Sequence, residues 1–459
     1  MDALIVIFVS GLISIFAAFA KKPAVVLLGA SGGLMVAIGL MVNQLITGDT
    51  FIQIDYEGLN FDSIALIFSL ALSVFTLLII SVGYERFKEE PNHTGEYIGL
   101  LVFSLCGAMI MTAFTDMFMF FLGLEILSIP IYVMAGSRKS DVRSNEASLK
   151  YFLMGAFATG LLLFGIAWIY GATQSFTIDG IAAAVANGDV AENPILLVGI
   201  LLILSSFVFK VGAAPFHFWS PDVYDGAPHA VTGFMASVVK MAAFAAFLKL
   251  FAGCFGGEML HDFWAPALAV LAVITLFVGN LSALRQVRLK RLLAFSSITH
   301  VGYTLLVILS NDQLATFDLW FYMAAYGFSI IGIITVGLVV NDSEDRIEAL
   351  RGLGKRNPLL AIVAVVSILS LAGIPPTAGF FGKYMVFSHA WNDWWWLVII
   401  ALINSAISIY YYLRMLGTVI STEETPGEKI VVNPLTAAVL VICLIGMLGL
   451  GALTPYLIG

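Results

Sequence analysis

The chain has 459 residues, of which 60% are hydrophobic and only 11% are charged, and its mean hydropathy is +0.98. An ordinary soluble domain carries roughly 25% charged residues, because its surface must face water. The composition therefore excludes a soluble fold and predicts an all-α integral membrane protein in contact with the lipid bilayer. The net charge of −8 gives no indication of a nucleic-acid partner, and none is expected.

The cysteines and glycines form no cofactor motif. Cys106, Cys254 and Cys443 lie far apart, without a CxxC pair or the spacing of an iron–sulfur site. No GxGxxG follows an expected strand, and no Walker sequence is present. We therefore expect no nucleotide, flavin or metal centre in this chain.

Apolar runs of about 18–25 residues, each long enough to span a bilayer, follow one another along the chain. We count about fourteen: 3–20, 24–46, 63–82, 97–114, 116–134, 147–170, 194–214, 228–251, 264–284, 290–309, 314–340, 358–391, 394–419 and 435–456. The first run has no small-x-small cleavage site and is followed by Lys21 and Lys22, so we interpret it as a retained helix.

Basic residues lie in alternate loops between these runs. The loops after odd-numbered runs hold Lys21, Lys22, Arg86, Lys88, Arg138, Lys139, Arg143, Arg285, Arg288, Lys290, Arg291, Arg346, Arg351, Lys355, Arg356 and Lys429. The loops after even-numbered runs hold none. The positive-inside rule then places the odd loops in the cytoplasm and both termini on the outer side of the membrane.

Five ionisable residues lie deep inside the apolar runs: Glu125, Lys210, Lys240, His300 and Lys383. A lysine at mid-membrane costs at least ~2.5–3.5 kcal/mol, so it normally faces a protein interior or a wet cavity. Such residues can form a structural charge network or an ion path. Three lysines against one glutamate favour a proton path, because a structural network should come closer to neutrality. For His300 a relay role and a simple helix contact are equally plausible.

Prolines interrupt two of the runs. Lys210 is followed by Val-Gly-Ala-Ala-Pro, and the long run before Trp391 contains LAGIPPTAGFFGK, ending in Lys383. Broken backbone is tolerated in a membrane only where it is buried or lines a cavity. Runs seven and twelve are five apart and cross in opposite directions, as inverted repeats require. We therefore expect broken helices 7 and 12 in a single membrane domain (1–459), with N-terminal helices (1–96), two inverted five-helix repeats (97–251 and 264–419) and a last helix (435–456).

Three motifs resemble the antiporter-like subunits of respiratory complex I: APFHFWSPDVYDGAP, KRLLAFSSITHVGY and GIPPTAGFFGKYMVF. The resemblance covers nearly the whole chain. Within that family the pattern favours subunit N, because M-type subunits usually carry glutamate where this chain has Lys383, and L-type subunits carry a long C-terminal extension. One departure is visible, since GAP is followed here by His229-Ala230 and in the family usually by Thr-Pro.

The resemblance implies a proton-translocating membrane-arm subunit of an NADH:quinone oxidoreductase. It implies that Glu125 pairs with Lys210, that Lys240 is the central lysine of span eight, and that Lys383 bears the ion in span twelve. NAD, FMN, iron–sulfur clusters and quinone would be held by partner subunits. The neighbours would be another antiporter-like subunit and small K/J-type subunits, in a bacterial inner membrane.

Other interpretations remain open at this stage. The chain could belong to a multi-subunit cation/proton antiporter or to a membrane-bound hydrogenase. It could also be a structural spacer whose buried charges only hold helices together. His217 and His229, with Asp222 and Asp225, flank the turn after run seven. They could line a proton uptake route or could be ordinary wet loop residues.

Overall fold

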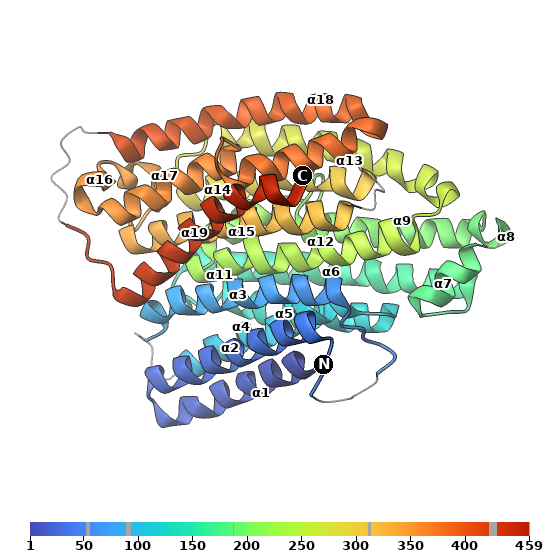
Figure 1. The fold of residues 1–459 in the computed structure, drawn as a ribbon, viewed down its shortest axis with the longest axis horizontal. Coiled ribbons are helices and arrows are strands. Elements are labelled where there is room, and N and C mark those ends of the chain that lie inside the picture. The colour runs from blue at the N-terminus through green and yellow to red at the C-terminus, as the bar shows by residue number, and fades with distance from the viewer. Residues whose placement is uncertain (52–55, 89–92, 187, 311–313, 422–428, 459) are drawn as a thin grey trace. The chain divides into compact units, whose positions relative to one another are not determined.

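The computed structural model describes residues 1–51, 56–88, 93–186, 188–310, 314–421 and 429–458. This described part is almost entirely helical (Figure 1), and its β structure is limited to isolated bridges such as that between Leu59 and Phe114. The predicted all-α class is therefore confirmed.

The chain divides into two compact units. Unit 1 comprises Met1–Val211 and Val238–Ala267, and unit 2 comprises Gly212–Ser237 and Leu268–Gly459. The chain thus leaves unit 1 after Lys210 and returns to it just before Lys240. Inverted repeats over residues 97–251 and 264–419 stay a prediction.

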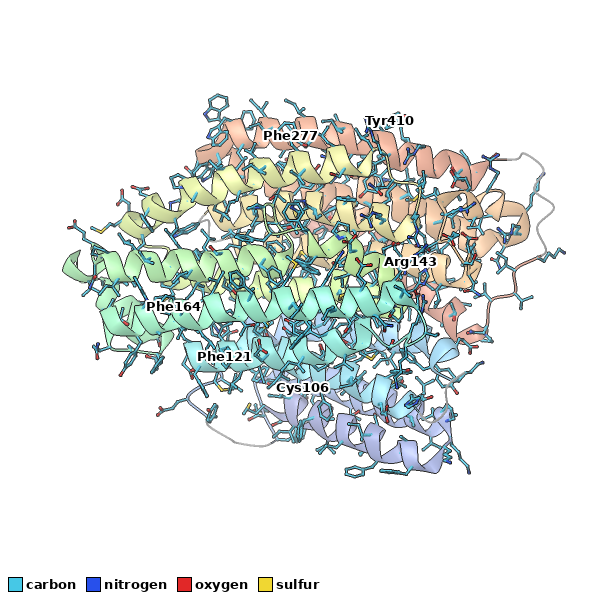
Figure 2. The ribbon with its side chains drawn as sticks, turned by 180° about the vertical axis from the view of Figure 1, so that it is seen from behind. Cys106, Phe121, Arg143, Phe164, Phe277 and Tyr410 are labelled. Atoms are coloured by element: carbon cyan, nitrogen blue, oxygen red, sulfur yellow. The ribbon has the colours of Figure 1, made fainter. Side chains whose placement is uncertain are left out.

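Unit 1 is a bundle of helices with short connections. Its elements are α1 (Asp2–Ala17), η1 (Ala18–Ala20), α2 (Pro23–Thr47), α3 (Ser63–Phe87), α4 (Thr94–Ala113), α5 (Met117–Ala135), α6 (Val142–Thr173), α7 (Ile178–Val185), α8 (Gly188–Ala191), α9 (Pro194–Val211), α12 (Lys240–Leu248) and the π-helical η3 (Lys249–Cys254). Large apolar side chains such as Phe164 of α6, labelled in Figure 2, are exposed on its surface. Exposed apolar side chains suit a surface that faces lipid.

Unit 2 holds the second set of helices. They are α10 (Trp219–Gly226), α11 (His229–Phe234), α14 (Leu289–Ser310), α15 (Ala315–Val340), η4 (Ile347–Leu350), α16 (Leu353–Arg356), α17 (Pro358–Ala372), α18 (Ala378–Ile420) and α19 (Pro434–Ile458). The π-helical η2 (Met235–Val239) and α13 (Glu258–Ala283) each contain a boundary between the units.

Twelve helices in the described residues are long and apolar enough to cross a membrane, and Asp2–Ala17 and Pro358–Ala372 are shorter apolar helices. Helix α18 is 43 residues long and bends at Trp394, whose φ of −125° and ψ of 37° are not helical. The bend falls where the sequence predicts a boundary between two spans. The multi-span architecture is confirmed, and the count of about fourteen spans stays a prediction.

Both predicted breaks are present. Helix α9 ends at Val211 and is followed by Gly212, with a φ of 77°, and α17 ends before Gly373, with a φ of 80°. Glycine adopts this left-handed conformation without the steric cost of a side chain, and it commonly ends helices. A proline follows each glycine within three residues. The two breaks therefore have the same local cause.

Glycines bring the helices of unit 1 into close contact. A Cβ at Gly107 of α4 would lie 2.2 Å from the backbone nitrogen of Leu127 in α5, and Ser104 donates a hydrogen bond of 2.6 Å to the Leu127 carbonyl. A Cβ at Gly165 of α6 would lie 2.9 Å from the carbonyl oxygen of Gly199 in α9. These contacts fix α5 and α9, the helices that carry Glu125 and Lys210.

We predict that Gly107→Ala destabilises the protein by about 1–3 kcal/mol, because the added methyl group forces α4 away from α5. The matched control is Gly160→Ala on α6, where an added Cβ meets no atom within 4 Å and alanine is the better helix former. Thermal unfolding of the purified complex should show a lower midpoint for Gly107→Ala only. Equal midpoints for the two variants would contradict the close-packing argument.

Candidate functional site

Lys210 lies in the last turn of α9 and is only 5% exposed. Its Nζ donates a hydrogen bond of 2.5 Å to Ser128 Oγ on α5 and lies 6.0 Å from the centre of the Tyr151 ring on α6. Ser128 in turn donates to the carbonyl of Leu124 one turn earlier. A hydroxyl group and an aromatic face therefore replace water around this ammonium group.

Glu125 is half-buried on α5, one turn before Ser128. Thr159 of α6 donates a hydrogen bond of 2.7 Å to Glu125 Oε1. Among the described contacts no direct ion pair joins Glu125 to Lys210. The expected pair thus occupies one unit, with Ser128 beside both residues.

Lys240 is the first residue of α12 and is 5% exposed. Helix α12 packs against α3, α4 and α9 within unit 1. The π-helical turn η2 directly precedes the lysine. Unit 1 therefore contains three of the five predicted residues: Glu125 on α5, Lys210 on α9 and Lys240 on α12.

His300 is buried in the middle of α14, in unit 2. Its Nδ1 lies 2.7 Å from the hydroxyl of Tyr322 on α15, and its Nε2 lies 3.1 Å from the hydroxyl of Tyr412 on α18. Tyr412 is also hydrogen-bonded to Ser296 of α14. Both ring nitrogens thus have a hydroxyl partner, so a proton can arrive at one nitrogen and leave from the other.

A cavity of about 10 Å³ adjoins His300. That volume matches a single buried water molecule, which needs two to four polar partners. Its lining residues include Tyr322, Tyr326, Ser329 and Ser370, whose hydroxyl groups can supply those partners. The cavity therefore suits one bridging water beside the histidine.

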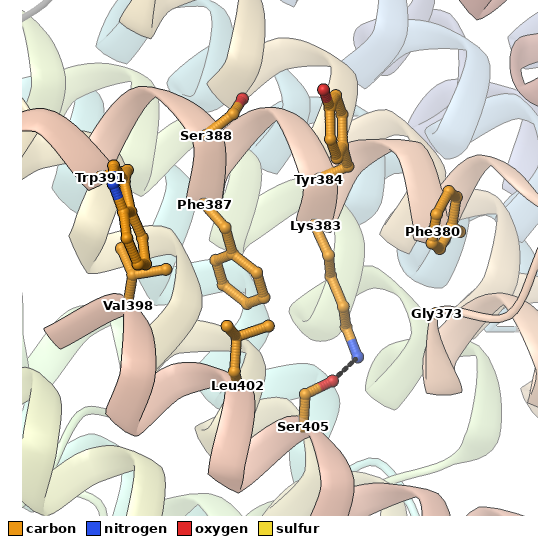
Figure 3. Close-up of a pocket in the computed structure, with 10 residues that line it drawn as sticks. All are labelled: Gly373, Phe380, Lys383, Tyr384, Phe387, Ser388, Trp391, Val398, Leu402 and Ser405. Atoms are coloured by element: carbon orange, nitrogen blue, oxygen red, sulfur yellow. Dashed lines mark hydrogen bonds between the residues drawn. The ribbon is translucent and has the colours of Figure 1, made fainter. Parts of the chain in front are cut away.

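Lys383 lies in the second turn of α18 and is 5% exposed. Its Nζ donates to the carbonyl of Ala372 at 2.9 Å and to Ser405 Oγ at 3.3 Å (Figure 3), and it lies 5.0 Å from the centre of the Tyr303 ring. Ala372 ends α17, so its carbonyl has no helical partner further along the chain. The break between α17 and α18 therefore supplies the acceptor for the lysine.

A pocket of about 480 Å³ opens beside Lys383. Figure 3 shows Phe387 and Trp391 in its wall, with Leu402 of the second half of α18 facing them. A Cβ at Gly373 would lie 2.8 Å from Lys383 Cδ. Glycine at this position therefore leaves room for the lysine side chain.

A charged network lies in the loops of unit 2. Asp345, which follows α15, accepts a hydrogen bond of 2.9 Å from the backbone nitrogen of Lys290 and lies 3.1 Å from His229 Nε2. Burial alone raises the pKa of Asp345, but the hydrogen bond and charge of His229, together with Lys290, outweigh burial and lower it. The carboxylate therefore stabilises the folded loop in its charged form.

Asp225, at the end of α10, belongs to the same network. Its carboxylate lies 2.5 Å from Arg288, and its backbone carbonyl accepts a hydrogen bond of 2.7 Å from Lys290 Nζ. Burial raises the pKa of Asp225 despite these cations. Asp222 pairs with Arg291 at 2.9 Å. These loop residues are thus tied to the start of α14, which contradicts the interpretation of His229 and Asp225 as ordinary wet loop residues.

Sequence reasoning missed the hydroxyl groups around the ionisable residues. The missed residues are Ser128, Thr159, Tyr322, Tyr326, Ser370, Ser405 and Tyr412, together with a pair formed by buried Asp318 and partly exposed His389. Asp318 lies only four residues after the start of a predicted span and therefore resembles an ordinary helix-end carboxylate. The signal that was available is the density of tyrosine and serine in runs ten, eleven and thirteen.

The sequence model of a family described as NADH:quinone oxidoreductase/Mrp antiporter, transmembrane, matches residues 115–408. The chain is 43% identical over 379 residues to NADH-quinone oxidoreductase subunit N of Trichlorobacter lovleyi, covering 81% of this chain and 76% of that protein. It is 40% identical over 434 residues to subunit N of Cytophaga hutchinsonii, covering 92% and 91%.

The fold has a counterpart in a solved structure. A chain in respiratory complex I from Thermus thermophilus matches with a TM-score of 0.85 and 31% identity, covering 99% of this chain and 97% of that one.

The protein is therefore a multi-span membrane protein of the antiporter-like class, with buried lysines and broken helices. The chain belongs to the NADH:quinone oxidoreductase/Mrp antiporter family and, within it, to the NADH-quinone oxidoreductase subunit N relatives. The resemblance seen in the three sequence motifs is thereby confirmed.

We predict that Asp345→Asn lowers stability at neutral pH by about 1.5–3 kcal/mol, the usual loss for a hydrogen bond to a charged group. The folded-state pKa of Asp345 is lowered, so its contribution is present above its ordinary value of 3.8 and is lost as pH falls through the folded value. The difference in unfolding midpoint between wild type and variant should therefore shrink in acid.

The matched control is Asp342→Asn in the same loop. Asp342 accepts a hydrogen bond from the backbone nitrogen of Arg346, and an asparagine oxygen can accept that bond equally well. A pH-independent loss in Asp345→Asn, or an equal loss in Asp342→Asn, would refute the role given to the Asp345 charge.

Proposed function

We propose that this chain is a proton-translocating membrane-arm subunit of an NADH:quinone oxidoreductase. The observation that supports this most directly is the burial of three lysines, each at 5% exposure, on helices that end or begin at backbone breaks or π-helical turns. Lysines so placed cost free energy in a membrane and are typical of ion paths. The similarity to subunit N relatives supports the redox partner.

The redox chemistry belongs to other subunits of that complex. The described residues hold no group of three or more His, Cys, Asp or Glu side chains arranged for a metal ion. We assign NAD, FMN, the iron–sulfur clusters and the quinone to partner subunits because the relatives of this chain are named as one subunit, N, of an NADH-quinone oxidoreductase. The neighbours in the membrane arm are another antiporter-like subunit and small K/J-type subunits.

The location is a bacterial inner membrane. The basic loops lie on the cytoplasmic side, as the positive-inside rule requires, and both termini lie on the outer side. Inverted five-helix repeats over 97–251 and 264–419 place one broken helix in each half of the path.

In the mechanism, Glu125 controls the charge of Lys210. A carboxylate ~4 Å from an ammonium stabilises it by about 4 kcal/mol at an effective dielectric of 20, and doubling the separation halves that energy. The difference of about 2 kcal/mol changes the proton-binding equilibrium roughly thirtyfold. Rotation of the Glu125 side chain between Thr159 and the side of α5 that carries Ser128 is therefore enough for Lys210 to bind or release a proton.

The proton then travels along a polar row. Lys210 passes it to Lys240 within unit 1, and His300 and Lys383 carry it through unit 2. Hydroxyl groups such as those of Tyr322 and Tyr412 bridge the ionisable residues, because a hydroxyl can donate one proton while accepting another.

We predict that Lys210→Ala lowers proton pumping and quinone reductase activity together, each by about a hundredfold or more, within the range for a lost acid–base group. The measurement is pumping and NADH:quinone reductase activity in the same membrane vesicles, with assembly checked by native gel. Glu125→Ala should assemble and should impair pumping in the same way.

The control is Lys150→Ala on α6. Lys150 pairs with Glu146 at 2.6 Å on the protein surface, with 39% of its side chain exposed. Its replacement should leave both activities near wild type. Full pumping in an assembled Lys210→Ala variant would show that the buried lysine is structural and that the mechanism is wrong.

A further inference from the structure

Helix α15 carries a stripe of polar residues through the interior of unit 2. Asp318, Tyr322, Tyr326 and Ser329 are spaced by four, four and three residues, so they project from one face of the helix. All four are buried, with exposures between 1% and 4%. A polar stripe at this depth requires partners on the facing helices.

Each residue of the stripe has such a partner. Tyr322 bonds to His300, Tyr326 donates to Ser297 at 2.9 Å, Ser329 donates to Ser370 at 2.7 Å, and Asp318 bonds to His389 Nδ1. The partners lie on α14, α17 and α18. The stripe therefore links the centre of unit 2 to the N-terminal end of α15.

Asp318 and His389 form the pair at that end. The Asp318 side chain is 3% exposed, whereas the His389 side chain is 28% exposed. Five residues after His389, Trp394 at the bend of α18 donates a hydrogen bond of 3.1 Å to the carbonyl of Leu309, near the end of α14. The pair thus joins a buried carboxylate to an imidazole that reaches the surface.

His389 lies on the opposite end of unit 2 from the basic loops. Arg288 and Arg346 form a β-bridge at the end of unit 2 where α14 begins and α15 has finished, whereas Asp318 lies where α15 begins. If the basic loops face the cytoplasm, His389 faces the outer side.

We propose that Asp318 and His389 form the proton-release site of this chain, supplied from His300 through Tyr322. This inference rests on the proposed function, since it names the point at which the translocated proton leaves. It assigns the last step to residues of α15 and α18 that do not include Lys383.

The transfer can be written bond by bond. Protonated His300 gives its Nδ1 proton to the Tyr322 oxygen, and Tyr322 gives its own hydroxyl proton to the Asp318 carboxylate one turn away, through a bridging water. Side chains on a helix lean toward its N-terminus, so the Tyr322 side chain leans toward Asp318. The Asp318 carboxyl group then gives its proton to His389 Nδ1, which makes the ring an imidazolium. The imidazolium loses its other N–H proton to outer water. The neutral ring returns to its starting tautomer by proton exchange with water.

The supply to His300 also has a route. Its Nε2 faces Tyr412, which is bonded to Ser296, while Nδ1 faces Tyr322. Nε2 therefore faces the hydroxyl pair formed by Tyr412 and Ser296, from which the proton arrives. Nδ1 faces Tyr322, through which the proton leaves. A histidine bonded at only one nitrogen could not pass a proton onward in this way.

The test is His389→Ala in the assembled complex, measured as NADH:quinone reductase activity in uncoupled membranes, without and with added imidazole. We expect a fall of about a hundredfold or more, in the range for a lost acid–base group, and recovery of activity with imidazole. Recovery distinguishes a proton carrier from a structural side chain. Asp318→Asn should lose activity similarly and should not recover with imidazole.

The matched control is His93→Ala. His93 pairs with Glu96 at 2.9 Å in unit 1, with 42% of its side chain exposed, so it repeats the chemistry of the pair outside the stripe. It should retain activity, with or without imidazole. His389→Gln keeps a hydrogen-bond donor near Asp318 but cannot carry the proton. If His389→Ala does not assemble, activity is measured in His389→Gln instead.

Two outcomes overturn the inference. Wild-type activity in assembled His389→Gln and Asp318→Asn would exclude the pair from the path, and a loss in His389→Ala without recovery in imidazole would make the histidine structural. The Lys210→Ala variant distinguishes a failure of the release-site proposal from a failure of the proposed function. If Lys210→Ala is inactive while the His389 variants are normal, only the release site is wrong; if Lys210→Ala pumps normally, the function itself is wrong.

Discussion

The free energy required to hold an ammonium group away from water governs this structure. Lys210 and Lys383 are both buried, and both donate to neutral oxygens and lie over tyrosine rings. A neutral oxygen stabilises an ammonium group less than a carboxylate stabilises it, so the lysine can lose its proton more easily. The close contact of α4 with α5 at Gly107 supports this arrangement in unit 1. In unit 2 the break after α17 leaves the Ala372 carbonyl without a helical partner, so it can accept the hydrogen bond from Lys383.

The two units meet this constraint with different chemistry. In unit 1 the half-buried carboxylate of Glu125 lies on α5, the helix whose Ser128 accepts a hydrogen bond from Lys210. In unit 2 the centre is a histidine between tyrosine hydroxyls, with a water-sized cavity beside it. Hydroxyl networks of this kind are strong only when every member is satisfied, which accounts for the number of serines and tyrosines around His300. In the proposed mechanism, unit 1 sets the charge of Lys210 and unit 2 conducts the proton.

Much of the fold and some of the site could be predicted from the sequence. Apolar runs predicted the spans, and the prolines after Lys210 and before Lys383 predicted both breaks, because these signals are local. The partners could not be predicted, since Ser128 meets Lys210 across 82 residues and Tyr412 meets His300 across 112. The sequence does not reveal Asp318, because its place near the end of a run predicts exposure, whereas packing against neighbouring helices buries it.

The π-helical turn before Lys240 has a consequence for comparison with relatives. A π turn holds about one residue more than an α turn, and each residue rotates the chain by about 100°. In an alignment, Met235–Val239 therefore acts as an insertion hidden inside an unbroken helix. A relative that lacked this turn would align without a gap on either side and still present the equivalent of Lys240 to a different neighbour. Matching lysines in two sequences are then equivalent in chemistry only when the helix phase before them also matches.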